Sequence, residues 1–99
     1  MKWNLNLIFD VFRILGAKRT DFDNIVQNDF SISGFVWTKY GQIYFESPWS
    51  EPYNLYLEFD DILNRAEVGR IMLEETQFDV FSSITKEKTY LLILSLNAK

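Results

Sequence analysis

This chain of 99 residues contains no histidine and no cysteine, and both absences restrict the chemistry open to it. Without histidine the chain lacks the most common general base, so no serine–histidine or cysteine–histidine pair can form. Without cysteine it has no disulfide, and the two most common zinc ligands are both missing. A chain without disulfides fits a reducing compartment, and we therefore expect a soluble cytoplasmic protein.

Glycine is also scarce, and the four glycines, at positions 16, 34, 41 and 69, match no phosphate-binding fingerprint. The apolar run at residues 90–96 is too short to cross a bilayer. Asp10 and Arg13 interrupt the apolar stretch near the N-terminus, which argues against a signal peptide. We expect no cofactor, no metal and no contact with a membrane.

What the chain does contain is an uneven distribution of charge around a net charge of −4. Residues 21–80 carry twelve carboxylates against three cations, whereas residues 1–20 and 81–99 are both basic. A partner that faces the middle of the chain would meet a negative field. Because the cations lie at the ends and form no continuous track, we do not expect direct binding to nucleic acid. Whether the two basic ends meet in space stays open.

Periodicity predicts one domain, residues 1–99, with a mixed α+β architecture. Apolar side chains recur at helical spacing over residues 4–15, and Thr20 followed by Asp21 suggests a short second helix through about Gln27. The expected strands cover residues 30–38, 42–46, 53–60, 78–85 and 89–97. The predicted fold is an antiparallel sheet of about five strands, with an N-terminal helix and one or two further short helices packed on it.

The register of the first hairpin can be read in two ways. A Tyr40-Gly41 turn would pair Trp37 with Tyr44, whereas a three-residue loop from Lys39 to Gly41 would shift the pairing by one residue. Such a shift moves Trp37 to the other face of the sheet. The apolar pattern favours the first register, in which Trp37 points outward.

Two further elements follow the strand at residues 53–60. Asp60 or Asp61 caps a helix that either ends near Gly69 or continues to Glu75. Residues 90–96 are apolar on both faces apart from Ser95, which predicts an interior strand.

Aromatic and acidic side chains alternate with the apolar ones along the predicted strands. Their outward face and the Trp49 loop between two prolines form the candidate partner-binding surface. Aromatic anchors among carboxylates suit a basic protein surface, and Trp49 is the strongest single candidate. The alternative is that a helix covers this face and that Trp49 folds back over the core. The candidate residues are Trp37, Tyr44, Glu46, Trp49, Glu51, Tyr56, Glu58 and Asp60.

The sequence therefore favours a small acidic binding protein without enzymatic activity. We expect it to occlude a basic surface of a protein partner, such as a nucleic-acid enzyme, in an inhibitor, immunity-type or nucleic-acid-mimic role. The alternative is an accessory subunit or a homo-oligomer that buries its surplus aromatic side chains in a permanent interface. Glu58 and Asp60 could in principle serve as acid–base groups or hold a hard cation, but a solvated strand face and a helix cap explain them more simply.

Overall fold

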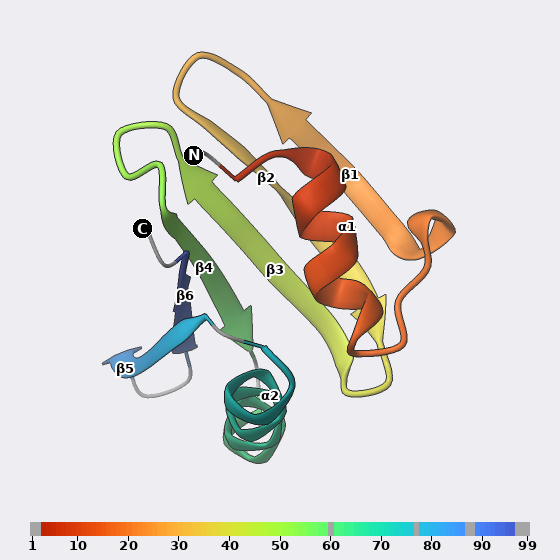
Figure 1. The fold of residues 1–99 in the computed structure, drawn as a ribbon, viewed down its shortest axis with the longest axis vertical. Helices are drawn as coiled ribbons and strands as arrows, with labels where there is room; N and C mark the ends of the chain where they lie inside the picture. The colour runs from red at the N-terminus through yellow and green to blue at the C-terminus, as the bar shows by residue number, and fades with distance from the viewer. Residues whose placement is uncertain (1–2, 60, 77, 87–88, 97–99) are drawn as a thin grey trace.

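The computed structural model describes residues 3–59, 61–76, 78–86 and 89–96, which form one antiparallel sheet and two α-helices (Figure 1). The sheet has six strands in the order β1-β2-β3-β4-β6-β5. Their bounds are β1 Phe22–Gln27, β2 Ser31–Thr38, β3 Gly41–Pro48, β4 Asn54–Phe59, β5 Asp79–Lys86 and β6 Thr89–Ser95. The predicted α+β class is confirmed, with one strand more than the five expected.

Helix α1, Leu5–Arg13, lies in front of β2, between β3 and β1, in the view of Figure 1. Asn4 caps its first turn by accepting a hydrogen bond from the backbone N–H of Leu7, at 3.0 Å. Gly16 follows the helix with a φ of +84°, a conformation that suits glycine and ends the helix as predicted. The buried face of α1 packs on the sheet and contributes Ile8, Val11 and Phe12 to the core.

Strand β1 replaces the helix predicted for residues 20–27, and that prediction was wrong. Phe22 pairs with Val36 of β2, and its ring meets those of Phe12 and Phe45 at centroid distances of 5.7 and 6.0 Å. The acidic residue read as part of a helix start instead closes a 3₁₀ turn, because the Asp21 carboxylate accepts from Lys18 N at 2.7 Å. Pairing with an exposed sheet edge and burial of one aromatic ring outweigh the local helix signal.

The β2–β3 hairpin confirms the predicted face of Trp37 but not the predicted register. Trp37 pairs with Gln42 and Val36 with Ile43, which is two residues away from the favoured pairing. Because a shift of two residues restores the same face, Trp37 still points outward, on the face that also carries Tyr44. The Thr38 hydroxyl fixes this register: it donates to Gly41 O at 2.9 Å and accepts from Tyr40 N at 3.0 Å.

The second half of the fold follows the remaining predictions closely. Asp61 caps helix α2, Ile62–Glu75, by accepting from the N–H groups of Leu63 and Asn64, so the longer of the two helices is the one observed. Strand β6 lies between β4 and β5, as its two apolar faces predict. Tyr53, the first residue of the strand predicted over residues 53–60, instead precedes β4 and is exposed.

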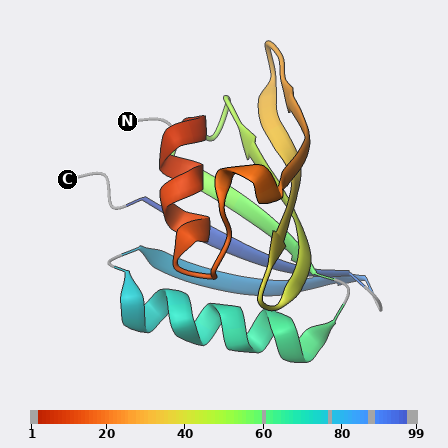
Figure 2. The same ribbon diagram turned by 90° about the vertical axis from the view of Figure 1, so that its right-hand side faces the viewer.

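Both helices pack against the same face of the sheet. Val68 and Met72 of α2 join the core to which α1 contributes, and a methyl group added at Gly69 would touch the inward-facing Leu92 of β6. Figure 2 shows α1 upright and α2 running crosswise below it, since the sheet twists strongly between its two halves. The opposite face of the sheet carries only exposed or half-buried side chains in strands β2 to β4.

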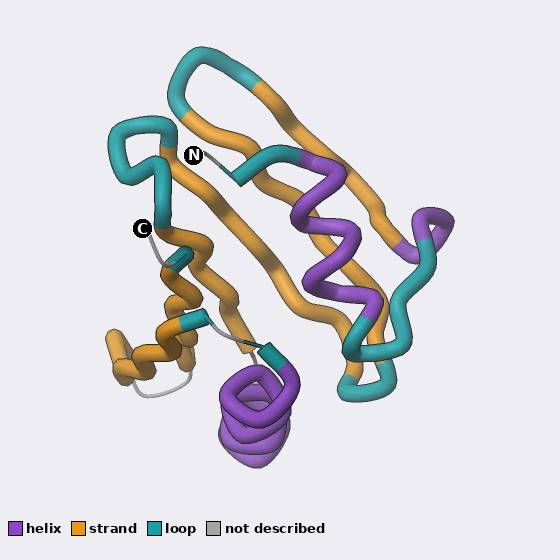
Figure 3. Tube along the Cα trace, viewed as in Figure 1, coloured by secondary structure: helices purple, strands orange, loops and turns teal. Residues whose placement is uncertain are grey.

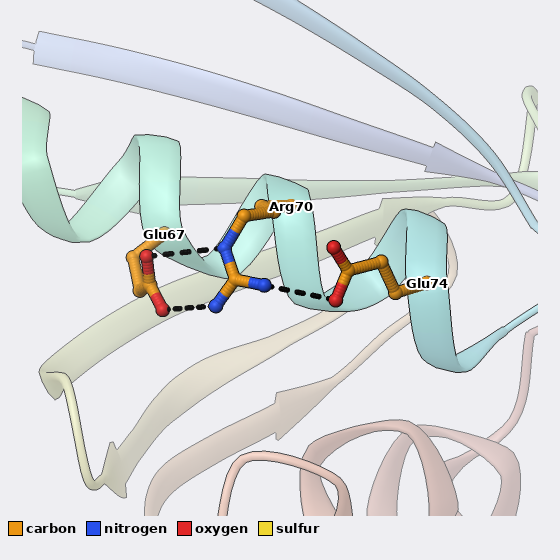
Figure 4. Close-up of polar contacts among 3 residues, drawn as sticks. All are labelled: Glu67, Arg70 and Glu74. Carbon is orange, nitrogen blue, oxygen red and sulfur yellow. Dashed lines mark hydrogen bonds and ion pairs between the residues drawn. The ribbon is translucent and has the colours of Figure 1, made fainter.

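Three charged residues on the outer side of α2 form a network of ion pairs. Arg70 donates to the carboxylate of Glu67, three residues earlier, and to that of Glu74, four residues later, at 2.8 Å (Figure 4). These side chains are exposed, so such pairs add little to stability. They do raise the pKa of Arg70 further and lower that of Glu67, chiefly through the hydrogen bonds between them.

Candidate functional site

Four predicted site residues meet on the open face of the sheet, where β3 and β4 pair. The register sets Tyr44 directly opposite Glu58 and Glu46 directly opposite Tyr56. Directly opposed side chains have Cβ atoms about 5 Å apart, so each tyrosine is the cross-strand neighbour of a glutamate. The two glutamates occupy one diagonal of this square and the two tyrosines the other. We call these four residues the Tyr–Glu square.

Two adjoining hollows cover the Tyr–Glu square. The first has a volume of about 500 Å³ and is lined by Phe35, Gln42, Tyr44, Glu46 and Glu58. The second, about 210 Å³, shares three of these residues and adds Pro48, Glu51 and Tyr56. Among the described residues, neither lysine nor arginine lines either hollow. The floor of this surface is therefore aromatic, and the charged groups that line it among the described residues are three carboxylates.

Both tyrosines of the square hold their protons more tightly than an ordinary tyrosine. Burial raises the pKa of Tyr44, and the negative charges of Glu46 and Glu58 raise it further, although a hydrogen bond with Ser33 acts in the opposite direction. The pKa of Tyr56 is raised first by its hydrogen bond to the Glu51 carboxylate and then by burial. Both phenols thus stay neutral donors well into the alkaline range.

These raised pKa values predict an alkaline loss of stability that depends on the square. A group whose pKa is raised in the folded state stabilises the fold fully below its unfolded pKa, here 10.0, and loses that contribution as the pH rises further. We expect the double variant Tyr44→Phe/Tyr56→Phe to show a shallower fall of unfolding free energy above about pH 10 than the wild type. Urea unfolding at a series of pH values measures both slopes, and equal slopes would contradict the prediction.

Trp37 lies on the same face, further along the hairpin, and is 54% exposed. It lines a third hollow of about 320 Å³ together with Gln42, Asp61 and Asn64, among others. Gln42 also lines the first hollow, so Trp37 extends the aromatic surface of the square. Asp60, the last of the predicted acidic residues, lies outside the described residues.

The structure places Trp49 differently from the expectation of an exposed anchor. Its ring is half-buried against the core, and its Nε1–H donates to Asn28 O at 2.7 Å. Its backbone N–H donates to Phe30 O, also at 2.7 Å. The alternative considered from the sequence, that Trp49 folds back over the core, describes its position correctly. Glu51, in contrast, does belong with the square through its hydrogen bond to Tyr56.

Sequence reasoning missed two residues of the first hollow and the exposure of a third residue, Phe30, which lies outside both hollows. Phe35 and Gln42 line the first hollow, and the ring of Phe35 lies 5.2 Å from that of Tyr44. Their alternation with Val36 and Ile43 was a usable signal, because it places them on the outward face. Phe30 begins the strand predicted over residues 30–38, yet it lies in the turn before β2 and is 80% exposed. No local pattern indicated that exposure.

Three of the described cations, Lys18, Arg19 and Lys39, lie near the end of α1 and line neither hollow. Lys18 and Arg19 follow that helix, and the guanidinium carbon of Arg19 stands 4.8 Å from the ring centre of Phe9. The side chain of Lys39 passes over Gly16. A patch between the two basic ends would need Lys2, Lys18, Arg19, Lys86 and Lys88 to converge, and of these Lys2 and Lys88 lie outside the described residues.

Comparisons with protein-family models, with curated proteins and with solved structures gave no significant match. In the part of the chain that the structure describes, no helix has the length and apolar character needed to traverse a membrane. Nor do three or more carboxylates there come together in a group that could hold a metal ion. The functional argument therefore rests on the open face of the sheet.

Proposed function

We propose that this protein is a non-enzymatic binding protein that occludes a basic surface of a protein partner with the open face of its sheet. The contact surface consists of the Tyr–Glu square, the neighbouring Glu51, Phe35 and Gln42, and Trp37. A nucleic-acid enzyme, whose own substrate is an anion, is the kind of partner whose surface this face would fit.

One observation carries the proposal: two hollows on an uncovered sheet face hold three carboxylates and no cation among the described residues. Carboxylates that face a basic partner speed its approach and orient it. Aromatic rings that become buried on binding slow its departure. Phe35, Trp37 and the two tyrosines of the square supply such rings beside the carboxylates.

The test is capture of a partner with and without the charges of the square. The double variant Glu46→Gln/Glu58→Gln keeps the shape of both side chains and removes two negative charges. We expect tagged wild-type protein to retain one basic protein from a lysate of its native host until moderate salt is applied. We expect the variant to lose that partner, with association slowed by at least about tenfold when the purified pair is measured by surface plasmon resonance.

A matched control carries the same change in net charge on another element. Glu74→Gln/Glu75→Gln removes two exposed carboxylates from the end of α2. This control should retain the partner at nearly the wild-type rate. If both double variants bind equally well, the open face is not the contact surface and the proposal fails.

A second candidate function, that of a subunit or homo-oligomer, is favoured by two leucines on α2. Leu63 and Leu73 are 75% and 60% exposed, and both lie on the outer side of the helix. A contiguous apolar patch marks an interface between subunits, and an interface that buried both leucines would have to run along most of α2. Sedimentation velocity separates the candidates: an inhibitor sediments as a monomer, whereas an oligomeric protein sediments as a larger species that Leu63→Ser/Leu73→Ser converts to monomer.

A further inference from the structure

The turn between β1 and β2 presents the most exposed large hydrophobic side chain in the described structure. Phe30 is 80% exposed, and the turn that carries it projects beyond the rest of the sheet in two views (Figures 2 and 3). An aromatic ring in this position contributes almost nothing to the core. Its neighbour Asp29 is also exposed, so the tip is apolar with an acidic flank.

The turn beneath Phe30 is held by five hydrogen bonds. The Asn28 side-chain oxygen accepts from Phe30 N at 2.8 Å and from Ser31 N at 3.0 Å, and Asn28 N donates to Ser31 O at 3.0 Å. Trp49 supplies the other two from the β3–β4 loop, through its ring N–H to Asn28 O and its backbone N–H to Phe30 O. These hydrogen bonds fix the backbone of the turn and therefore the position from which the Phe30 ring projects.

An exposed aromatic ring on a fixed turn is what an anchor residue requires. Binding energy at protein interfaces concentrates in a few aromatic side chains that enter partner pockets. A turn that is already ordered loses little conformational freedom when its partner binds. Trp49, the strongest candidate from the sequence, therefore serves as a positioning residue for its neighbour in space and need not touch the partner itself.

We infer that Phe30 inserts into an apolar pocket with a basic rim on the same partner that covers the open face, with Trp49 holding the turn in place. The basic rim follows from Asp29, the exposed carboxylate that precedes Phe30 in the turn. This inference rests on the proposed function. It adds a second, apolar attachment point to a surface otherwise dominated by the Tyr–Glu square.

The experiment places a photo-crosslinking phenylalanine, p-benzoylphenylalanine, at position 30 of the full chain in its native host. The same group at position 63, where Leu63 is 75% exposed on α2, is the control. We expect residue 30 to crosslink the basic protein retained by the open face, at an apolar segment beside lysine or arginine. Equal crosslinking from position 63, or none from position 30, would overturn the inference.

Binding of the purified partner then separates the roles of the two aromatic residues. Phe30→Ala should weaken affinity by at least about tenfold without changing stability or amide exchange in the turn. Trp49→Phe keeps a ring but removes the donor to Asn28; it should speed exchange of the Phe30 and Ser31 amides and weaken binding less. If Trp49→Phe leaves those amides unchanged, Trp49 does not position the turn.

The outcomes also distinguish this inference from the proposed function on which it rests. If Glu46→Gln/Glu58→Gln abolishes binding while Phe30→Ala binds as the wild type does, the open face stands and the anchor is refuted. If neither variant changes binding, both proposals fail. If both variants weaken it, the partner is attached at two points.

Discussion

Replacing Phe45 by alanine is expected to destabilise the protein by about 3–5 kcal/mol, the range measured for fully buried aromatic residues. Phe45 is completely buried on β3. Its ring meets that of Phe12 from α1 at 5.7 Å and that of Phe22 from β1 at 6.0 Å. Truncation would leave a cavity where helix and strands meet, and neither neighbour could close it without leaving its own element. Urea unfolding followed by tryptophan fluorescence measures the loss.

The matched control for this variant is Phe35→Ala on the neighbouring strand. Phe35 points to the open face and is half exposed, so its loss should change stability by less than about 1 kcal/mol. Comparable losses from the two variants would mean that the open face is packed as tightly as the core, and the proposed contact surface would then be covered.

Gly34→Ala is expected to destabilise the protein by about 1–3 kcal/mol. A methyl group at Gly34 would lie 3.2 Å from Asp23 O, from Ile25 Cα and from the tip of the Phe45 ring. Two of these atoms belong to the backbone of β1, where the pairing with β2 is interrupted by a bulge between Asp23 and Val26. Backbone atoms cannot rotate away as a side chain can, so β1 itself would have to shift.

The same substitution at Gly69 should have the opposite sign. Gly69 lies inside α2, where alanine is favoured over glycine by about 1 kcal/mol, and its added methyl group would meet Leu92 Cδ1 at an ordinary 3.7 Å. We therefore expect Gly69→Ala to raise the midpoint of urea unfolding and Gly34→Ala to lower it. If Gly34→Ala is as stable as the wild type, the backbone of β1 can shift to accommodate the methyl group at little cost in free energy.

The elements that sequence reasoning identified are those whose signals are local and complete. Helix α1 has both an apolar face and a glycine stop, and β4 alternates without interruption from Asn54 to Phe59. The alternation also predicted correctly that Tyr44, Glu46, Tyr56 and Glu58 share one face. Period-two patterning specifies which face of a strand a side chain occupies. The register of the hairpin was wrong by two residues, and a shift of two leaves the face of Trp37 unchanged.

What the sequence could not indicate depends on contacts between distant segments. Phe22 forms a strand because an edge of β2 and two aromatic rings are available to it, and none of these is near it in the chain. Trp49 takes its position from Asn28, which is 21 residues earlier in the sequence. No property of the Pro48–Pro52 segment indicates that partner. Phe30 was placed in the strand over residues 30–38 because it continues the alternation of that strand, whereas the hydrogen bonds to Asn28 hold it in the turn.

The position of β6 between β4 and β5 has a consequence for how the chain acquires its structure during synthesis. Strands β1 to β4 pair in sequence order, so this meander has all its partners once residue 59 has emerged from the ribosome. β4 nevertheless keeps a bare edge, and β5 has no neighbour, until residues 89–95 arrive and insert between them. Unpaired edges of this kind recruit other chains, so the interval before the last strand emerges is when nascent copies are most prone to aggregate.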